Sequence, residues 1–481
     1  MATRKQAGQV FTPHYLVCDI LDVAGYYGDI ILQKHIIDNS CGDGAFLQEI
    51  VQRYCTEYLK QSTNLQQLSQ DLSTYIHGIE LDPIAYNECI HNLNTIVAQY
   101  HLQQIEWDVR NTDALSVADF DNRMDYVVGN PPYVRVHNLA DNYANVKHFR
   151  FTQDGMTDLY LAFYEIGFGM LCQGGKLCYI TPSSWINSLA GSMLRQYICI
   201  QHNLVKLIDL EHYQPFDAMA YTMIALFEKG IRHEDFIYYT YIGDKHIIMS
   251  QECLRIEEVM IGNILYLADR KTLKDLRNIF LQKHKQIVQV KNGFATLADG
   301  VFISPNLPFT KYVIPVLKAS TGKWSKALFP YTPQGVPLSH EQIFSDQAIS
   351  KYLEENKSYL LKGQSEQACP EWYLYGRTQA LKDVCKDKYA INTIVIDTQS
   401  IKFEKVPSGA GVYSGLYILT EVDEDTLRSI LYTEEFMQYV RSLRHYKSGG
   451  YYTFSSKELE QYINYKLDNY EDNSRTLFSI D

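Results

Sequence analysis

Short apolar runs alternate with longer amphipathic stretches through the first half of the chain. Runs of a few residues rich in Ile, Val, Leu and Tyr are typical of strands buried in a parallel sheet, and the stretches between them have a helical period. Such alternation predicts a doubly wound α/β sheet whose ligands bind at the carboxyl ends of the strands. We expect strands at 35–38, 75–79, 125–129, 176–180, 204–208 and 221–229, with helices at 45–59 and 83–100 among those between them.

The pattern changes after about residue 290, where Thr, Gly, Pro and Tyr are scattered among shorter strand-like runs. This texture predicts a mixed α+β domain. The stretch before it has a helical pattern and is typical of a connector. We therefore divide the chain into a sheet domain over 1–245, a helical basic connector over 246–290 and a mixed α+β domain over 291–481.

Composition is that of an ordinary globular protein. The 481 residues exceed what one hydrophobic core normally supports, and 46% hydrophobic with 21% charged residues excludes a disordered or fibrous chain. No apolar run approaches the ~18 residues of a membrane span, and the start lacks the apolar core of a signal peptide. The ten cysteines include no Cys-x-x-Cys pair, so we expect reduced thiols, no metal centre and a cytoplasmic protein without a membrane segment.

Charge is unevenly distributed along the chain. Residues 1–240 carry a net charge of −12, whereas the remaining residues sum to zero. Within the second half, seven basic residues and one acidic residue lie between Arg270 and Lys291. Such a stripe can follow a phosphate backbone, but a solvated helix face has the same composition, and charge alone favours the second interpretation.

A glycine-containing loop joins the strand at 35–38 to the helix at 45–59. It reads Asp38-Asn39-Ser40-Cys41-Gly42-Asp43-Gly44. Glycines let the backbone approach a ligand closely, and the N-terminus of the following helix favours negative charge. A tight strand–helix turn needs the same glycines, so the loop alone is as consistent with a plain turn as with a cofactor site. The candidate cofactor residues in it are Asp38, Ser40, Gly42 and Gly44.

Acidic residues also follow the second strand and lie in a loop further along the chain. Glu80, which precedes Leu81, is placed to accept hydrogen bonds from both ribose hydroxyls of a nucleoside. Asp82, which is followed by a proline, fits a helix N-cap better than a ligand. Asp113, before Ala114, can accept a hydrogen bond from an adenine amino group, although a surface acid is equally consistent with this residue alone.

Asn130-Pro131-Pro132-Tyr133 follows the strand at 125–129. The prolines fix the backbone and leave their carbonyls outside the strand ladder, so the carbonyl of Pro131 can point into a site. The Asn130 side-chain oxygen and this carbonyl can each accept one N–H of an exocyclic amino group, which directs the nitrogen lone pair toward a methyl donor. Tyr133 supplies a ring face for stacking on a base. A rigid turn explains the prolines but neither of the residues beside them.

The order of these motifs resembles that of the S-adenosyl-L-methionine-dependent DNA methyltransferases that modify amino groups. With a target-recognition region at the C-terminal end, it resembles their gamma class, stand-alone or associated with restriction-modification, and Asn-Pro-Pro-Tyr within that class points to N6 of adenine. Ser40 stands where this family usually has a proline, so the shape of the cofactor loop is expected to differ. The resemblance is close over 8–230 and looser beyond, at 290–303, 372–377 and 449–452.

Further site residues are implied by this resemblance. Gly8-Gln9-Val10-Phe11-Thr12-Pro13 is similar to the family's leading motif, which lies against the methionine part of the cofactor. The segment 158–163 is similar to a later motif whose Phe packs on the cofactor's adenine. Pro215-Phe216 resembles the motif whose ring contacts a flipped base, a role assigned to Phe216 ahead of Tyr221. Together with the loop residues above, the implied cofactor set contains Phe11, Thr12, Pro13, Glu80, Leu81, Asp113, Ala114 and Phe163.

The resemblance implies transfer of a methyl group from S-adenosyl-L-methionine to adenine N6 in duplex DNA after base flipping, with Asn130, Pro131, Pro132 and Tyr133 as catalytic residues. It implies a catalytic role for the sheet domain and target recognition for the domain over 291–481. The expected partners are double-stranded DNA and a separately encoded restriction endonuclease. Only seven residues precede Gly8, so no nuclease is expected to be fused there. The expected DNA contacts are Lys274, Lys283, Lys285, Lys291 and Arg377.

Two other classes of function stay open. RNA adenine and protein glutamine methyltransferases also use Asn-Pro-Pro-Tyr, although the roughly 190 residues after position 290 favour a long, sequence-bearing substrate. The other class is a DNA-recognition or anti-phage assembly subunit without independent catalysis. The intact Asn130, Pro131, Tyr133 and Glu80 argue against an inactive site.

Overall fold

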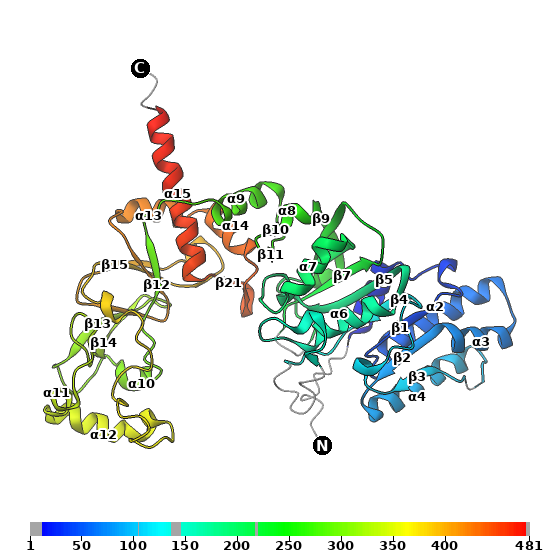
Figure 1. Cartoon of the computed structure of the whole chain (residues 1–481), viewed down its shortest axis with the longest axis horizontal. Helices are drawn as coiled ribbons and strands as arrows, with labels where there is room; N and C mark the ends of the chain where they lie inside the picture. Colours follow the sequence, from blue (N-terminus) through cyan, green and yellow to red (C-terminus); the bar gives the residue numbers. More distant parts are fainter. Residues whose placement is uncertain (1–11, 104, 136–145, 217–219, 478–481) are drawn as a thin grey trace. The chain divides into compact units, whose positions relative to one another are not determined.

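The computed structural model describes residues 12–103, 105–135, 146–216 and 220–477, which form two compact units (Figure 1). The N-terminal unit runs to Leu273, and the C-terminal unit begins at Lys274. The predicted doubly wound sheet of the first half and the mixed α+β character of the second half are both confirmed. No helix in the described ranges is long and apolar enough to cross a membrane.

A nine-stranded sheet forms the centre of the N-terminal unit. Its strands are β1 (Ile36–Asp38), β2 (Ile76–Glu80), β3 (Asp108–Asn111), β4 (Met124–Gly129), β5 (Leu171–Pro182), β6 (Leu204–Asp209), β7 (Thr222–Glu228), β8 (Asp235–Ile242) and β9 (Ile247–Arg255). They lie in the order β3-β2-β1-β4-β5-β7-β6-β8-β9. The first five strands in this order, from β3 to β5, run parallel to one another, whereas β7 lies antiparallel between β5 and β6. The strand order reverses between β1 and β4, the position where sheets of this type bind ligands.

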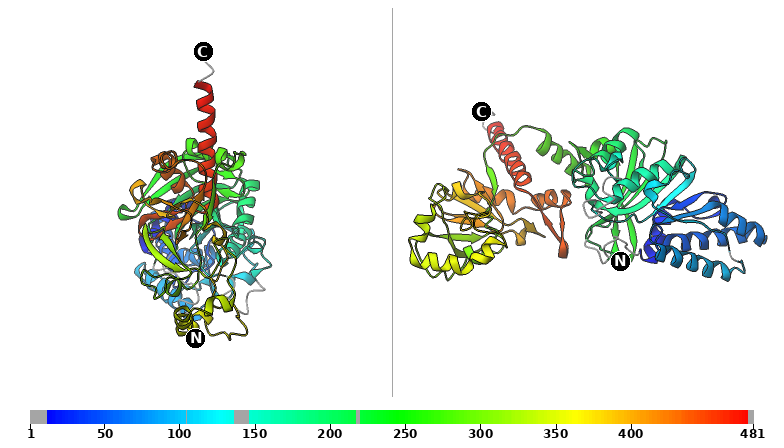
Figure 2. Two further views of the ribbon diagram at one scale, coloured as in Figure 1. Left: turned by 90° about the vertical axis from the view of Figure 1, so that its left-hand side faces the viewer. Right: turned by 60° about the horizontal axis from the view of Figure 1, so that its bottom comes forward.

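Helices connect these strands and pack against the sheet (Figure 2). They are α1 (His14–Ala24), α2 (Ala45–Gln61), α3 (Leu65–Tyr75), α4 (Pro83–Gln99), α6 (Leu159–Met170), α7 (Ser192–Gln201) and α8 (Ile256–Val259), followed by the short strands β10 (Met260–Ile261) and β11 (Ile264–Leu265). The Asp82 carboxylate accepts a hydrogen bond from Ile84 N at 2.8 Å, so it caps α4 as predicted. Leu16 and Ile20 of α1 and Ile50 of α2 are fully buried in the core.

The C-terminal unit combines small sheets with helices. The helix α9 (Arg270–Leu281) leads into it. Its strands are β12 (Gln289–Asn292), β13 (Val313–Lys318), β14 (Lys323–Leu328), β15 (Lys388–Ile391), β16 (Ile394–Val395), β17 (Phe403–Val406), β18 (Gly411–Tyr413), β19 (Leu416–Leu419), β20 (Tyr446–Lys447) and β21 (Tyr451–Thr453). Its helices are α10 (Asp299–Phe302), α11 (His340–Phe344), α12 (Gln347–Leu361), α13 (Glu424–Leu431), α14 (Glu434–Ser442) and α15 (Ser456–Leu477).

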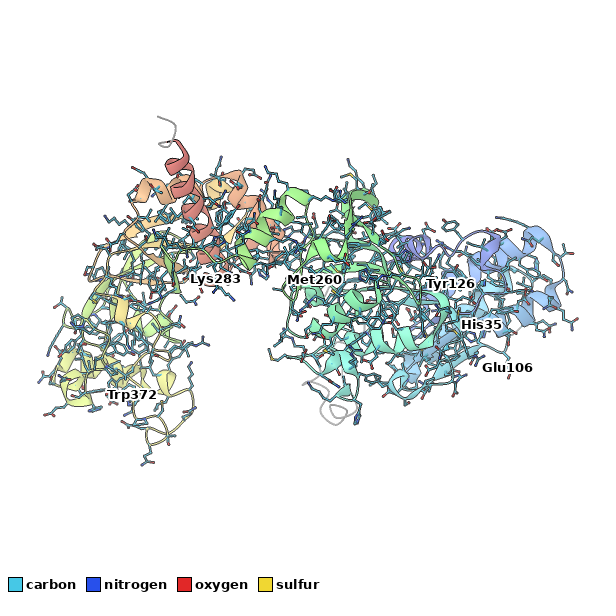
Figure 3. The ribbon with its side chains drawn as sticks, turned by 45° about the horizontal axis from the view of Figure 1, so that its top comes forward. His35, Glu106, Tyr126, Met260, Lys283 and Trp372 are labelled. Atoms are coloured by element: carbon cyan, nitrogen blue, oxygen red, sulfur yellow. The ribbon has the colours of Figure 1, made fainter. Side chains whose placement is uncertain are left out.

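These strands form three separate sheets, ordered β12-β19-β15-β17, β14-β13-β18 and β16-β21-β20. Buried aromatic side chains fill the core around the second of them, with Trp372 and Tyr373 packed on Phe344 of α11 and Tyr375 packed on Phe329 and Tyr331. Trp372, labelled in Figure 3, lies at the α11–α12 end of the unit. These three aromatic residues therefore belong to the core of the unit.

The helix α15 completes the edge of β12 with side chains instead of a strand. Asn464 Oδ1 accepts hydrogen bonds from Ile287 N at 2.8 Å and Val288 N at 2.9 Å. Glu460 Oε2 accepts one from Val290 N at 2.8 Å. Backbone donors that an edge strand would leave to solvent are thereby satisfied within the unit.

The boundary between the units differs from the sequence-based division. The sheet does not end near residue 245, because β9 pairs antiparallel with β8 and extends it to Arg255. Within the stretch expected to be a helical connector, the longest helix is α9, and the units divide at 273/274. Most residues of β9 lie outside the core, so its sequence lacks the buried apolar run that marks the other strands.

Candidate active site

The carboxyl ends of β1, β2 and β4 lie side by side at the reversal of strand order. Asp38, the last residue of β1, is in register with Gly78 of β2 and Val128 of β4. Because parallel strands end at the same edge of a sheet, the loops that follow these three strands meet there. The loops carry Asp38 to Gly44, Glu80 and Asn130 to Tyr133, the residues that the sequence singled out.

Glu80 ties two of these loops together through backbone donors. Its Oε2 accepts a hydrogen bond from Gly42 N at 2.8 Å, and its Oε1 accepts one from Asp82 N at 2.8 Å. The side chain is buried, whereas Leu81 beside it is 63% exposed. Glu80 therefore fixes the distance between the loop after β1 and the loop after β2.

Gly44 lets the loop after β1 pack closely on α4. Its φ is +88°, and a Cβ there would lie 2.7 Å from Cys89 Sγ. Gly42 has φ +55° and faces open space, since a Cβ would have no atom within 4 Å. The loop thus needs glycine at 44 for contact and conformation, and at 42 for its left-handed backbone.

Asp38 is buried at the centre of this edge, with an exposed fraction of 1%. Its Oδ1 accepts a hydrogen bond from Ser40 N at 3.1 Å. Burial raises the pKa of Asp38 to about 7, the Ser40 N–H opposes the rise, and the negative charge of Glu80 adds to it. A buried carboxyl group whose pKa lies near neutral pH is stabilised as an anion by any cation that binds beside it.

Gly129, at the end of β4, was not predicted as a site residue. Its φ is +148°, and a Cβ there would lie 2.6 Å from Asp38 Oδ1. The position therefore admits only glycine if β4 is to lie this close to Asp38. The signal in the sequence was a glycine directly before Asn130, which strand propensity alone does not explain.

Asn130 is held by a residue from the start of the chain. Its Nδ2 donates a hydrogen bond to Thr12 Oγ1 at 3.1 Å, and Thr12 is buried immediately before Pro13 and α1. The sequence suggested Thr12 as a cofactor residue and not as a partner of Asn130. Phe11, the neighbouring candidate, lies outside the described residues.

Tyr133 and Phe216 lie next to each other beyond Asn130. Their ring centroids are 6.3 Å apart with an interplanar angle of 78°, an edge-to-face pair. The Tyr133 hydroxyl donates a hydrogen bond to Ile180 O at 3.3 Å, which anchors the ring to the end of β5. Phe216 is buried, with an exposed fraction of 8%.

Asp113 and Phe163 belong to the neighbouring part of the same edge. Asp113 Oδ1 accepts a hydrogen bond from Leu115 N at 3.0 Å and caps the 3-10 turn Ala114–Ser116. The helix α6, which carries the buried Phe163, packs against this turn. Structure therefore brings the two candidates for adenine contacts into one neighbourhood.

The basic candidates in the C-terminal unit fall into two groups. Lys274, Lys283, Lys285 and Arg377 are exposed, and Lys283 is labelled in Figure 3. Lys291 instead forms an ion pair with the buried Asp383, with 2.8 Å between Lys291 Nζ and Asp383 Oδ2. This ion pair gives Lys291 a structural role that the sequence did not predict.

Comparison with known proteins shows which families this chain is similar to. Residues 49–216 match the model of the Eco57I restriction-modification methylase family. The chain is 28% identical over 276 residues to the Type II methyltransferase M.BstVI of Geobacillus stearothermophilus, covering 53% of this chain and 47% of that protein. It is 22% identical over 503 residues to the Type II methyltransferase M.AccI of Acinetobacter calcoaceticus, covering 95% and 85%.

The fold is also similar to a solved structure, the Type IIL restriction-modification enzyme MmeI in complex with DNA. The TM-score is 0.65 at 11% identity, over 92% of this chain and 63% of that one. The chain spans about half the length of the first relatives it matches, 47% of M.BstVI and 43% of the Type II methyltransferase M.XhoI of Xanthomonas vasicola. These findings confirm the predicted resemblance to restriction-modification methyltransferases.

Proposed function

Because residues 49–216 match a restriction-modification methylase, we propose that this chain transfers a methyl group from S-adenosyl-L-methionine to N6 of adenine in a specific duplex DNA sequence. The observation that carries the proposal is the placement of Asn130-Pro131-Pro132-Tyr133 at the reversal of strand order, with the Asn130 amide held by Thr12. The reaction would take place in the cytoplasm, where the cell's DNA is accessible.

The residues at the sheet edge fit S-adenosyl-L-methionine, which when bound supplies an electrophilic methyl group on a sulfonium. Ser40 Oγ is buried and has no hydrogen-bond partner among the described residues, so a polar group of a ligand can supply one. The carboxylates of Asp38 and Glu80 suit the positive charge and the ribose hydroxyls of this cofactor. Asp113 and Phe163 would hold its adenine, and Thr12 and Pro13 would lie against its methionine part, with Leu81 and Ala114 completing the set.

Asn130 and Pro131 would hold the target amino group. An exocyclic amine has two N–H donors, and the Asn130 Oδ1 and the Pro131 carbonyl can accept one each. Since the Asn130 Nδ2 donates to Thr12, the amide presents its oxygen on the opposite side. The two acceptors would orient the amine lone pair toward the methyl group that the bound cofactor would supply, so that the amine would not have to be deprotonated beforehand.

Tyr133 and Phe216 would stack on the adenine after it leaves the duplex. Extrusion of a base costs a few kcal/mol, and stacking on an aromatic ring returns about 1–3 kcal/mol per base. The rings are now edge-to-face, so a base lying between them requires one ring to rotate. The hydrogen bond of Tyr133 to Ile180 O holds that ring, which makes Phe216 the ring expected to turn.

The C-terminal unit is the part proposed to read the DNA. Exposed Lys274, Lys283, Lys285 and Arg377 would contact phosphates, which contribute affinity without sequence information. Methylation of the recognised sequence would then protect the DNA from cleavage by a separately encoded restriction endonuclease. The size of this unit, residues 274–481, favours a long nucleic-acid substrate over a protein glutamine.

Methyl transfer from radiolabelled S-adenosyl-L-methionine to defined substrates tests the proposal. The purified chain is incubated with a pool of duplex DNA, with RNA and with protein, and the labelled products are hydrolysed and separated. The expected product is N6-methyldeoxyadenosine from DNA alone. Label in RNA adenine or in glutamine would contradict the acceptor, and absence of label from every pool would favour a recognition subunit.

A further inference from the structure

Three side chains of metal-ligating types converge on α1 and α2. His14 and Cys18 lie one turn apart on α1 and therefore on the same face. Glu49 faces them from α2, with 3.0 Å between its Oε2 and His14 Nε2. Cys18 Sγ lies 3.8 Å from the same His14 nitrogen, and one donor atom from each residue lies within 4.8 Å of the others.

These separations suit the ligand shell of a single ion. Zinc is bound at about 2.0–2.2 Å by nitrogen and oxygen and at about 2.3 Å by sulfur, almost always in a tetrahedron, which places neighbouring ligand atoms roughly 3.3–3.6 Å apart. Two of the separations, 3.0 and 3.8 Å, lie on either side of that range, and all three lie within 4.8 Å. An ion centred among the three would therefore require these side chains to rotate.

Arg53 orients Glu49 within the cluster. Its Nε donates to Glu49 Oε1 at 2.8 Å, which leaves Oε2 directed at His14. Arg53 is itself held by Asp22 Oδ1 at 2.6 Å and by the Tyr26 carbonyl at 3.0 Å. Ligating carboxylates in metal sites are typically oriented in this way by a second hydrogen bond.

A surface ion pair is the simpler explanation for His14 and Glu49, and such a pair contributes little to stability. It does not account for the thiol at the third corner or for the orientation imposed by Arg53. The histidine side chain is 74% exposed, so an ion has access from solvent.

We propose that His14, Cys18 and Glu49 bind a borderline-soft divalent cation of the zinc type, with water as the fourth ligand. No Cys-x-x-Cys motif signals this site, because two of its ligands are four residues apart on a helix and the third is 31 residues further on. The ion would clamp the start of α1 to α2. Thr12, whose hydroxyl accepts the hydrogen bond from the Asn130 amide, lies two residues before His14. The bound ion would therefore restrict the motion of this hydrogen-bonded pair. Metal binding here does not depend on the proposed methyl transfer.

Cobalt titration of the full chain tests the site. The protein, without a histidine tag, is stripped with a chelator under reducing conditions and titrated with Co²⁺, whose thiolate complexes absorb in the near ultraviolet. We expect a thiolate-to-cobalt band that saturates at one equivalent, is lost in Cys18→Ser and is weakened at least about tenfold in affinity in His14→Gln. Cys253→Ser, which removes an exposed thiol of β9, is the matched control and should keep the band.

His14→Gln keeps the test decisive if Cys18→Ser fails to fold, because the exposed His14 ring contributes nothing to the core. A band that persists in Cys18→Ser, or that is equal in His14→Gln and the wild type, would overturn the proposal by assigning the metal to other thiols. Absence of any band in the folded wild type would overturn it as well. Zn²⁺ at a fixed concentration should also raise the unfolding midpoint of the wild type more than that of His14→Gln.

Discussion

Two aspartates, one in each unit, are almost equally buried, yet their surroundings push their pKa values in opposite directions. Asp38 in the N-terminal unit is 1% exposed, and its pKa is raised to about 7 by burial, with a backbone N–H opposing and Glu80 adding to the rise. Asp383 in the C-terminal unit is 4% exposed. Burial raises its pKa as well, but hydrogen bonds from Lys291, Lys386 and Tyr417 outweigh this and lower it to about 2.

The difference distinguishes a carboxyl group that we propose binds the cofactor from a structural one. Asp383 has its countercharges within its own unit, with both Lys291 Nζ and Lys386 Nζ at 2.8 Å, so it completes a packed core. Asp38 lies beside another carboxylate at the edge where parallel strands present their ligands. A cationic ligand would stabilise its charged form, which is what the proposed cofactor offers.

The largest expected effect comes from the residue that would hold the target amine. Asn130→Ala should lower methyl transfer by at least about 10²–10³-fold, since it removes an acceptor of the amino group in the transition state. Affinity for S-adenosyl-L-methionine should stay within a few fold. Turnover assays and calorimetric binding on the same preparation measure both quantities. An equal loss of binding and turnover would move Asn130 from the amine to the cofactor.

The next largest effect is on stability and belongs to the C-terminal unit. Asp383→Ala should lower the free energy of unfolding by on the order of 3 kcal/mol, because it leaves the charges of Lys291 and Lys386 without their buried counter-ion. Cofactor affinity should be unchanged. Denaturant unfolding and cofactor titration of this variant provide the check, and a substantial loss of cofactor binding would erase the distinction between the two aspartates.

The pH dependence of stability should differ between the aspartates. The folded-state pKa of Asp38 lies above the unfolded value of 3.8, so the stability it contributes is present at low pH and is lost as the pH rises toward about 7. Between pH 5 and 6.5 this amounts to about 2 kcal/mol. The folded-state pKa of Asp383 lies below 3.8, so its contribution is present above that pH and is lost as the pH falls toward about 2.

Asp38→Asn should therefore flatten the stability profile between pH 5 and 6.5 and weaken cofactor binding. Thermal unfolding of the wild type and this variant across that range measures the effect. If Asp38→Asn and the wild type show the same dependence of stability on pH, Asp38 is already charged at low pH and is paired like Asp383.

The smallest expected effect concerns the contact between Thr12 and Asn130. Thr12→Val keeps the shape of the side chain and removes the hydroxyl that accepts the Asn130 Nδ2 hydrogen, which frees the amide to turn. We expect kcat to fall about tenfold, equivalent to about 1.4 kcal/mol and typical of one hydrogen bond. Thr12→Ser should retain near-wild-type kcat. A change confined to KM for the cofactor would show that Thr12 acts on cofactor binding alone and not through Asn130.

Local patterns predicted the loops of the sheet edge, whereas contacts between distant residues escaped prediction. Asp38 and Glu80 end short buried strands and Asn130 follows one, and a polar residue at the end of such a strand can be recognised from neighbouring residues alone. The Thr12–Asn130 bond joins residues 118 positions apart, and no local pattern signals it.

The C-terminal unit was less predictable for the same physical reason. Lys291 belongs to a basic run that suggested phosphate contacts, yet its partner Asp383 is 92 positions away. The sequence pattern predicts a helical connector where β9 lies, because most residues of this strand are not buried and it lacks the apolar run that marks the other strands. Its strand character comes from pairing with β8.

Single-molecule sequencing of genomic DNA from a host that expresses this chain tests the central claim most directly. The host is compared with one that expresses Asn130→Ala, and both genomes are scored for N6-methyladenine. The account predicts one sequence motif that is fully modified at adenine in the first genome and unmodified in the second. A first genome without modified adenine, from a chain that binds S-adenosyl-L-methionine, would contradict it.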